Sequence, residues 1–185
     1  NVLAGIDRIT AKDGLNMSPK RITVSTAGIA KMIDKLADDK VKFNLALSLH
    51  AADDKKRDTI MPINETNTLD ALMKSLRWFY DETGNRITFE YILFYDFNDS
   101  IEDAEKLLTY ARRVPSKVNI IEYNPISEAT FTKADPKTID RFANHLIKGG
   151  VATSVRRSRG KDIDAACGQL ANKSKVAWPC SNRLQ

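Results

Sequence analysis

The stretch RITFEYIL, from Arg86 to Leu93, is predicted to form a β-strand because it is rich in β-branched and aromatic residues. After it, apolar residues recur at three- and four-residue spacing between Ile101 and Leu108, which is typical of an amphipathic helix. The run KVNIIEY from Lys117 predicts the next strand. Strand, helix and strand at this spacing imply parallel pairing through a right-handed crossover. This stretch therefore places the chain in the α/β class.

The same alternation extends in both directions from that unit. Further strands are predicted at RITVS from Arg21, FNLALSL from Phe43 and VATSV from Val151, and further helices over 29–36, 69–79 and 139–146. Helix ends are indicated by a capping box at Ser100 and Asp103, an N-cap at Thr138, and Gly149 with Gly150 after the last helix. A closed eight-stranded barrel takes about 250 residues. Five strands in 185 residues, with a helix first, instead predict a partial (β/α) barrel or an open sheet whose N-terminal strands are missing.

Composition restricts the class of protein further. The length fits one domain, 42% of the residues are hydrophobic and 29% are charged, and no apolar run approaches the ~20 residues of a membrane span. The first residues lack a secretory signal pattern, so a cytoplasmic location without a membrane is expected. The two cysteines, Cys167 and Cys180, are too far apart for a metal clamp, and no metal site is expected. The net charge of +5 allows a polyanionic partner, although on charge alone surplus Lys and Arg on a solvated surface are the favoured explanation.

Polar side chains follow several predicted strands at their carboxyl ends, where ligands bind in such folds. The pairs at these ends are Ser25 and Thr26, Ser48 and His50, Tyr95 and Asp96, Tyr123 and Asn124, and Arg156 and Arg157. Each has a plainer explanation: Ser25 and Thr26 could cap a helix, Asn124 with Pro125 could form a turn, and His50 could be a solvated loop residue. Their coincidence on one rim predicts a ligand-binding α/β domain.

Several consecutive segments resemble the RlmN/Cfr family of radical SAM RNA methyltransferases. They are GLNMSPKRITVSTAG from Gly14, LALSLHAADD from Leu45, MPIN from Met61, RITFEYIL from Arg86, YNP from Tyr123 and VRRSRGKDIDAACGQL from Val155. Their order and approximate spacing also match. The resemblance covers 1–173 as the C-terminal part of a radical SAM partial barrel, and leaves 174–185 as an unassigned tail, in which Cys180 has no role.

The resemblance implies a radical mechanism at C2 of adenine in 23S rRNA and tRNA. Family members transfer a methyl group from S-adenosylmethionine to a C-terminal cysteine, which by position is Cys167. A second S-adenosylmethionine, cleaved reductively at a 4Fe-4S cluster, yields a radical that takes hydrogen from this methyl group, and the resulting carbon radical adds to C2. Since C2 is not nucleophilic, polar methyl transfer would fail there. Cationic neighbours of Cys167, such as Arg159 and Lys161, would favour the reactive thiolate.

The resemblance also assigns binding residues. By motif, the S-adenosylmethionine contacts are Ser25, Ser48, Leu49, His50 and Asn124. We expect the basic loop to bind RNA phosphates, because guanidinium groups pair well with them. Its candidate residues are Arg156, Arg157 and Arg159.

The chain also departs from the family pattern. The three-cysteine cluster loop, the Gly-Glu-Pro segment, the general base and the cysteine that resolves the RNA adduct are absent, and we expect all of them upstream of Asn1. The complete enzyme would need a cluster, an electron donor and RNA, and we expect a monomer. The fragment alone is expected to be inactive.

Two alternatives remain at this stage. The chain could be a non-catalytic remnant that still binds S-adenosylmethionine or RNA. It could also be an unrelated partial-barrel enzyme such as an aldolase, which would place a lysine at the end of a strand. Lys42 and Lys117 are predicted at strand starts, which disfavours the aldolase.

Overall fold

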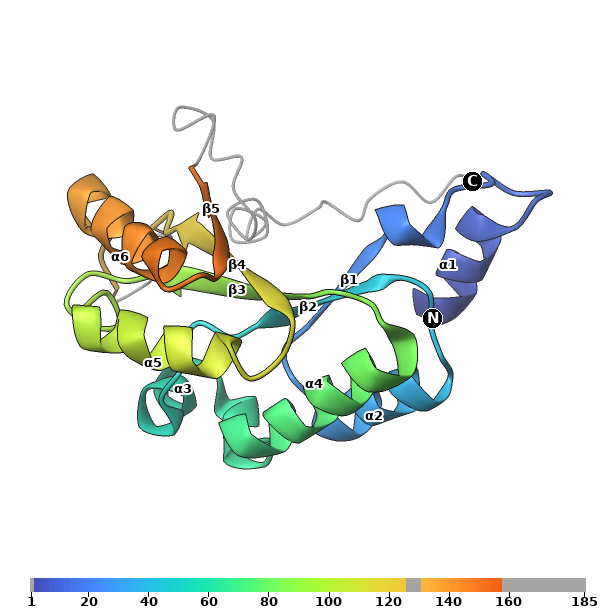
Figure 1. Cartoon of the computed structure of the whole chain (residues 1–185), viewed down its shortest axis with the longest axis horizontal. Helices are drawn as coiled ribbons and strands as arrows, with labels where there is room; N and C mark the ends of the chain where they lie inside the picture. The colour runs from blue at the N-terminus through green and yellow to red at the C-terminus, as the bar shows by residue number, and fades with distance from the viewer. Residues whose placement is uncertain (1, 126–130, 158–185) are drawn as a thin grey trace, which may run out of the picture.

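The fold is a five-stranded parallel sheet in the order β1-β2-β3-β4-β5, seen in a computed structural model that describes residues 2–125 and 131–157 (Figure 1). The strands are β1 (Thr23–Thr26), β2 (Asn44–Ser48), β3 (Ile87–Leu93), β4 (Ser116–Glu122) and β5 (Ala152–Arg156). All four pairings are parallel. The sheet does not close, so the predicted α/β class and open partial barrel are confirmed.

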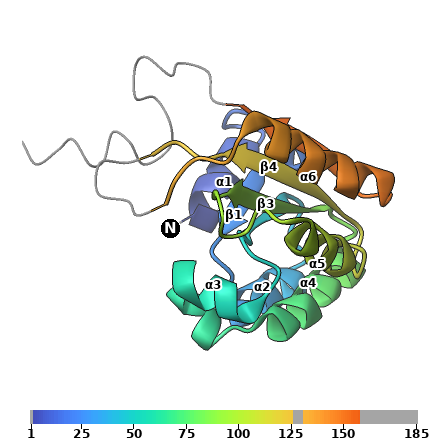
Figure 2. The same ribbon diagram turned by 90° about the vertical axis from the view of Figure 1, so that its left-hand side faces the viewer.

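Helices connect the strands. They are α1 (Val2–Thr10), α2 (Ala30–Asp38), α3 (Asp54–Ile60), α4 (Leu69–Thr83), α5 (Ile101–Ala111) and α6 (Pro136–Lys148), with single 3-10 turns at Pro19–Arg21 and Pro62–Glu65. Figure 2 shows α2, α4, α5 and α6 wrapped around one side of the curved sheet. No helix in the described part of the chain is long and apolar enough to cross a membrane.

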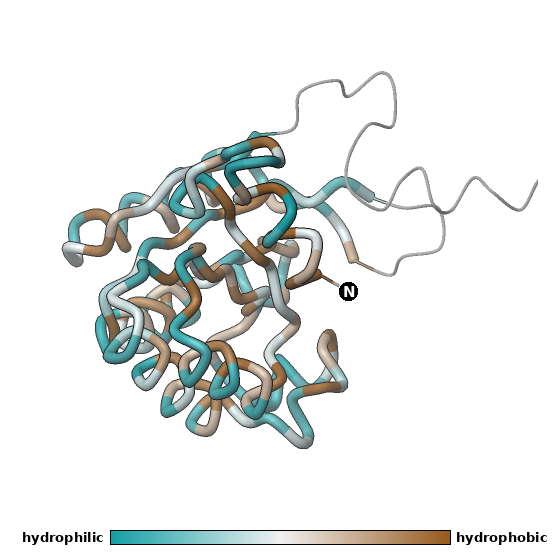
Figure 3. The backbone as a smooth tube through the Cα atoms, turned by 90° about the vertical axis from the view of Figure 1, so that its right-hand side faces the viewer, coloured by the Kyte–Doolittle hydropathy of each residue, from teal (hydrophilic) through white to brown (hydrophobic). Residues whose placement is uncertain are grey.

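The hydrophobic core lies between the sheet and these helices. Leu47, Phe89 and Val118 are paired in register and fully buried on this face. The ring of Phe89 contacts Tyr110 of α5, with centroids 5.6 Å apart, and Tyr91 contacts Phe142 of α6 at 5.5 Å. These contacts place α5 and α6 on the same face of the sheet. Figure 3 shows the corresponding alternation of hydrophobic and hydrophilic residues along the helices.

Helix ends follow local chemistry in most places. The capping box at Ser100 and Asp103 is confirmed, with the Ser100 hydroxyl accepting a hydrogen bond from the Asp103 amide at 3.1 Å. Gly149 ends α6 as expected, and Gly150 has a φ of +82°. The predicted N-cap at Thr138 is wrong. Asp135 caps α6 instead, because its carboxylate accepts from the Lys137 and Thr138 amides and Pro136 fits the first helical turn.

We expect Ser100→Ala to lower the free energy of unfolding by about 1 kcal/mol, because the Asp103 amide loses its capping acceptor. Urea denaturation of the purified protein measures this change. Ser100→Thr serves as the control, since threonine keeps a capping hydroxyl and should remain close to the parent. An alanine variant as stable as the parent would show that the cap contributes nothing.

Candidate functional site: the open face and the carboxyl edge of the sheet

The face of the sheet that turns away from the helices is polar. Successive side chains of a strand point to opposite faces, so the residues between the buried core positions lie on this open face. Across it, Ser48, Glu90, Asn119 and Ser154 are paired in register on β2, β3, β4 and β5. None of the four is buried. Parallel sheets usually have both faces covered by apolar contacts, so a polar row here indicates a surface for a polar ligand.

Hydrogen bonds connect three members of this row. The Ser154 hydroxyl donates to Asn119 Oδ1 at 2.7 Å, and Asn119 Nδ2 donates to Glu90 Oε1 at 3.0 Å. The chain of donors therefore ends in the Glu90 carboxylate, beside Ser48 on the next strand. Sequence analysis missed Glu90 and Asn119. The available signal was a lone carboxylate and a lone amide inside otherwise apolar strands, at positions that alternate with core residues.

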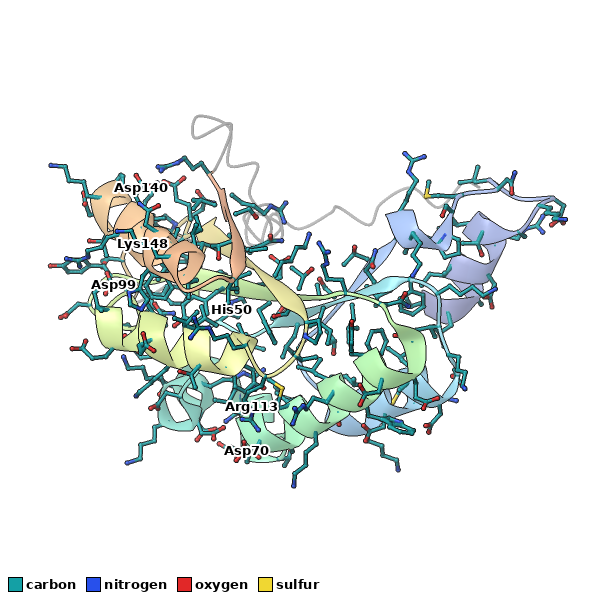
Figure 4. The ribbon with its side chains drawn as sticks, in the orientation of Figure 1. His50, Asp70, Asp99, Arg113, Asp140 and Lys148 are labelled. Atoms are coloured by element: carbon teal, nitrogen blue, oxygen red, sulfur yellow. The ribbon has the colours of Figure 1, made fainter. Side chains whose placement is uncertain are left out.

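His50 lies directly after β2 and is held by hydrogen bonds at its carbonyl and at its ring. Its backbone has a φ of +58°, an uncommon conformation outside glycine, and its carbonyl accepts a hydrogen bond from Asn98 Nδ2 at 2.7 Å. The ring nitrogen Nδ1 accepts from the Ile92 amide at 3.2 Å. His50 is thus not the solvated loop residue of the plainer interpretation. Figure 4 shows it at the sheet, away from the surface ion pair of Asp70 with Arg113.

The charge state of His50 follows from this environment. Burial, helped by the positive charge of Arg57, lowers the pKa of His50 from 6.5 to about 4, so the ring is neutral at pH 7. Because Nδ1 is an acceptor, the hydrogen of the neutral ring is on Nε2. Within the described residues Nε2 makes no hydrogen bond, which leaves it available to donate to a ligand.

The other predicted contact residues occupy the same region. Ser25 is exposed near the end of β1, and Ser48 is half-buried at the end of β2. Asn124 follows β4, and its Nδ2 makes one long hydrogen bond, of 3.4 Å, to the Glu122 carbonyl. Leu49 differs, since its side chain is fully buried and its amide donates to the Glu90 carbonyl at 2.9 Å. The structure therefore places Ser25, Ser48, His50 and Asn124 towards the same carboxyl edge of the sheet, on β1, β2 and β4 or directly after them, and directs the Leu49 side chain into the core.

The plainer explanation for Ser25 and Thr26 does not hold. Neither caps α2, whose N-cap is Ile29 without a side-chain hydrogen bond. The Ala30 amide is instead satisfied by Asn67 Oδ1 at 2.9 Å, and the Thr26 hydroxyl accepts from the Gly28 amide at 3.1 Å. Ser25 is thus left without a capping role.

The arginines predicted to bind RNA differ in their ion pairs. Arg156 and Arg157 are both exposed at the end of β5, where Arg156 is paired with Ile121. Arg157 forms an ion pair with Asp140 of α6 at 2.6 Å, whereas no ion pair of Arg156 is found within the described part of the chain. Cys167 and Arg159 lie outside the described residues, as does the tail over 174–185. In those described residues no group of His, Cys, Asp or Glu could hold a metal ion.

Known proteins resemble this chain over most of its length. It is 59% identical over 173 residues to a probable dual-specificity RNA methyltransferase RlmN of Cytophaga hutchinsonii, which covers 94% of this chain and 47% of that protein. It is 42% identical over 161 residues to the dual-specificity RNA methyltransferase RlmN of Nautilia profundicola, covering 87% of this chain and 46% of that protein. The chain thus spans about half the length of the curated relatives it matches. No protein-family model matches it.

A solved structure agrees with these sequence matches. The crystal structure of a radical SAM methyltransferase from Sphaerobacter thermophilus superimposes with a TM-score of 0.86 at 39% sequence identity. The match covers 91% of this chain and 49% of that one. The two chains therefore share one fold over the matched part.

We expect the free energy of unfolding to depend on pH through His50. Its pKa is lower in the folded state than in the unfolded chain, so the unfolded state binds more protons between pH 6.5 and about 4. The stability contributed by the neutral ring is therefore fully present above pH 6.5 and is lost as the pH falls towards 4. The shift corresponds to roughly 3 kcal/mol.

The control for this prediction is His50→Asn, which tolerates the positive φ but does not titrate. The measurement is urea denaturation of both proteins from pH 7 to pH 4. The two proteins are compared because the titration of their shared carboxylates then cancels. The free energy of unfolding of the parent should fall relative to that of His50→Asn as the pH is lowered. A constant difference across this range would show that His50 does not have a lowered pKa.

Proposed function

Because the chain belongs to the RlmN family of radical SAM methyltransferases, we propose that the whole protein methylates C2 of adenine in RNA. The observation that carries this proposal is the 59% identity to an RlmN protein over 94% of the chain. The finer substrates that we propose are 23S rRNA and tRNA, in accord with the dual specificity in the names of the relatives. Such an enzyme would work in the cytoplasm, as a monomer, with an external electron donor.

The described residues fit S-adenosylmethionine. This ligand supplies an electrophilic methyl group and a cleavable sulfonium, and it carries hydroxyl, amino and carboxylate groups that need polar partners. Ser25, Ser48 and Asn124 would supply such partners at the carboxyl edge. His50 would add a neutral donor at Nε2, since Nδ1 is engaged by the Ile92 amide. The buried Leu49 would contribute by fixing the backbone between Ser48 and His50.

The cluster does not fit this chain's own residues. A 4Fe-4S cluster of this enzyme class needs three neighbouring thiolates, and the sequence holds two cysteines with twelve residues between them. We therefore propose that the cluster and the electron that it delivers belong to another part of the protein.

Cys167 is the proposed acceptor of the methyl group. Its thiolate would attack the methyl carbon of S-adenosylmethionine, so that a carbon–sulfur bond forms as the sulfonium bond breaks and S-adenosylhomocysteine leaves. The thiol proton would be lost beforehand, which the positive charges of Arg159 and Lys161, close to Cys167 in the sequence, would favour. We assign 1–173 to the methyltransferase and give 174–185 no role.

RNA would approach the end of β5. Arg156 is exposed and unpaired among the described residues, so its guanidinium is available to a phosphate. Arg157 must first leave Asp140, which reduces what it can contribute. Arg159 completes the proposed basic loop. The alternative function, a non-catalytic S-adenosylmethionine- or RNA-binding remnant, would keep these contacts without methyl transfer.

The test of the proposed function follows the methyl group in the full-length protein. With methyl-labelled S-adenosylmethionine and protein digestion, we expect label on the Cys167 peptide and none on Cys180. Cys167→Ala should abolish 2-methyladenosine formation, because no other group replaces the nucleophile. Cys180→Ala is the matched control and should be nearly silent. Label on Cys180, or a Cys167→Ala protein that methylates at close to the parental rate, would refute the assignment.

The basic residues make a second prediction. Arg156→Gln should weaken binding to unrelated RNAs alike and lower the slope of log K against log salt by about 1, because one phosphate contact is lost. Arg157→Gln should have a smaller effect, since its ion pair with Asp140 already occupies it. Filter binding at several salt concentrations measures both. If Arg156→Gln impairs one RNA sequence and spares others, the residue contacts bases and the proposal is wrong.

A further inference from the structure

A buried arginine lies behind the proposed ligand site. Arg57 of α3 carries a positive charge, yet its side chain is 0% exposed and is among the largest that are fully buried in the described part of the chain. Its Nε donates to the Leu49 carbonyl at 3.1 Å. Its Nη2 donates to the Ala27 carbonyl at 2.8 Å and to the Ser48 carbonyl at 3.2 Å. One guanidinium therefore binds the backbone of two segments, just after β1 and at the end of β2.

The guanidinium is itself fixed from the other side. Arg57 Nη1 donates to Asn64 Oδ1 at 2.7 Å, and Asn64 is 1% exposed. The Asn64 amide in turn donates to Asp54 Oδ1 at 2.9 Å and to Asp58 Oδ1 at 2.7 Å. A planar guanidinium with all three nitrogens bonded has one orientation available. The contact to Ala27 and the contact to Leu49 are consequently held at a fixed separation.

Gly28 preserves the space for this arrangement. A Cβ at this position would lie 3.1 Å from Arg57 Nη2 and 3.0 Å from a methyl group of Leu47. Its φ of +102° also disfavours any other residue. The chain after β1 thus passes close against the arginine.

A core-filling role alone does not account for Arg57. Burying a charge is costly, and an apolar side chain of similar size fills a core at lower cost. What the guanidinium adds is a set of donors for carbonyls at the strand ends, where the sheet no longer supplies partners to all of them. Those carbonyls belong to the segments that carry Ser25, Ser48 and His50.

We propose that Arg57 is a positioning residue for S-adenosylmethionine, which sets the ends of β1 and β2 at the separation that the ligand requires. The inference rests on the proposed function, because it concerns the same ligand. Arg57 touches no ligand in this proposal. It acts through the backbone of Ala27, Ser48 and Leu49, and so through the placement of the side chains beside them.

The test compares Arg57→Lys with the parent in the full-length protein. Lysine keeps the positive charge, but one ammonium nitrogen cannot occupy the positions of Nε, Nη1 and Nη2 together, so it cannot bond the acceptors of Ala27, Leu49 and Asn64 at the same time. We expect the dissociation constant for labelled S-adenosylmethionine, measured by equilibrium dialysis, to rise at least tenfold. The matched control is Phe79→Leu, a core change near the end of α4, eight residues before β3 begins and thus towards the amino edge of the sheet. This control should lose stability in urea while keeping the parental dissociation constant.

A second readout needs no ligand. Arg57→Lys retains the positive charge near His50, so this charge does not change the pKa of the ring. A change in the pKa of His50, measured by NMR, therefore reports a change in the burial of the ring. We expect this pKa to rise towards 6.5 as the ring becomes solvated. If Arg57→Lys does not fold, Asn64→Ser, which removes one anchor of the guanidinium, enters the same comparison.

The outcomes separate the two proposals. Parental affinity in Arg57→Lys together with an unchanged pKa of His50 would overturn the positioning role. Equal losses of affinity in Arg57→Lys and Phe79→Leu would also overturn it, since stability alone would then explain the effect. A parent that does not bind S-adenosylmethionine would refute the proposed function. In that case the pKa of His50 still decides whether Arg57 positions the strand end.

Discussion

Every crossover between neighbouring strands passes over the same face of the sheet. Right-handed crossovers in a fixed strand order leave no other choice, and the helices α2, α4, α5 and α6 therefore share one side. The aromatic contacts from β3 to α5 and to α6 are both on that side. The rest of the structure depends on this asymmetry, because it gives the strands one apolar face and, within the described residues, releases the other face from packing against helices.

The released face explains why polar residues are tolerated within the strands. Glu90 and Asn119 would be costly in a sheet covered by helices on both sides, since a buried carboxylate needs strong compensation. On the open face they bond to each other and to Ser154 and remain partly exposed. At the carboxyl edge of the sheet, polar side chains from the ends of separate strands lie next to this open face. Polar side chains thus gather where the fold does not require hydrophobic contacts.

The sequence was sufficient for the sheet but not for the parts that support the site. All five strands follow from apolar runs, because burial of the strands imposes a simple pattern. Helix α3, with the sequence DKKRDTI, has no such pattern and was not predicted. It forms because Asp53 caps it, with a side-chain oxygen accepting from the Lys56 amide at 3.2 Å. The N-cap of α6 was misplaced although the sequence carried the signal, since Asp135 directly before Pro136 is the pattern of an N-cap followed by proline in the first helical turn.

The role of Arg57 could not have been inferred from its neighbours in the chain. In DKKRDTI it follows two lysines and suggests a solvated surface, yet Lys55 is exposed and Arg57 is fully buried. Its partners come from residues 27, 48, 49 and 64, and only the folded chain brings these together. The residues proposed to contact a ligand stand at strand ends and can be expected from topology. A residue that holds those ends in place satisfies backbone carbonyls that have no sequence signature, so it becomes visible only when each buried polar group is matched to its partner.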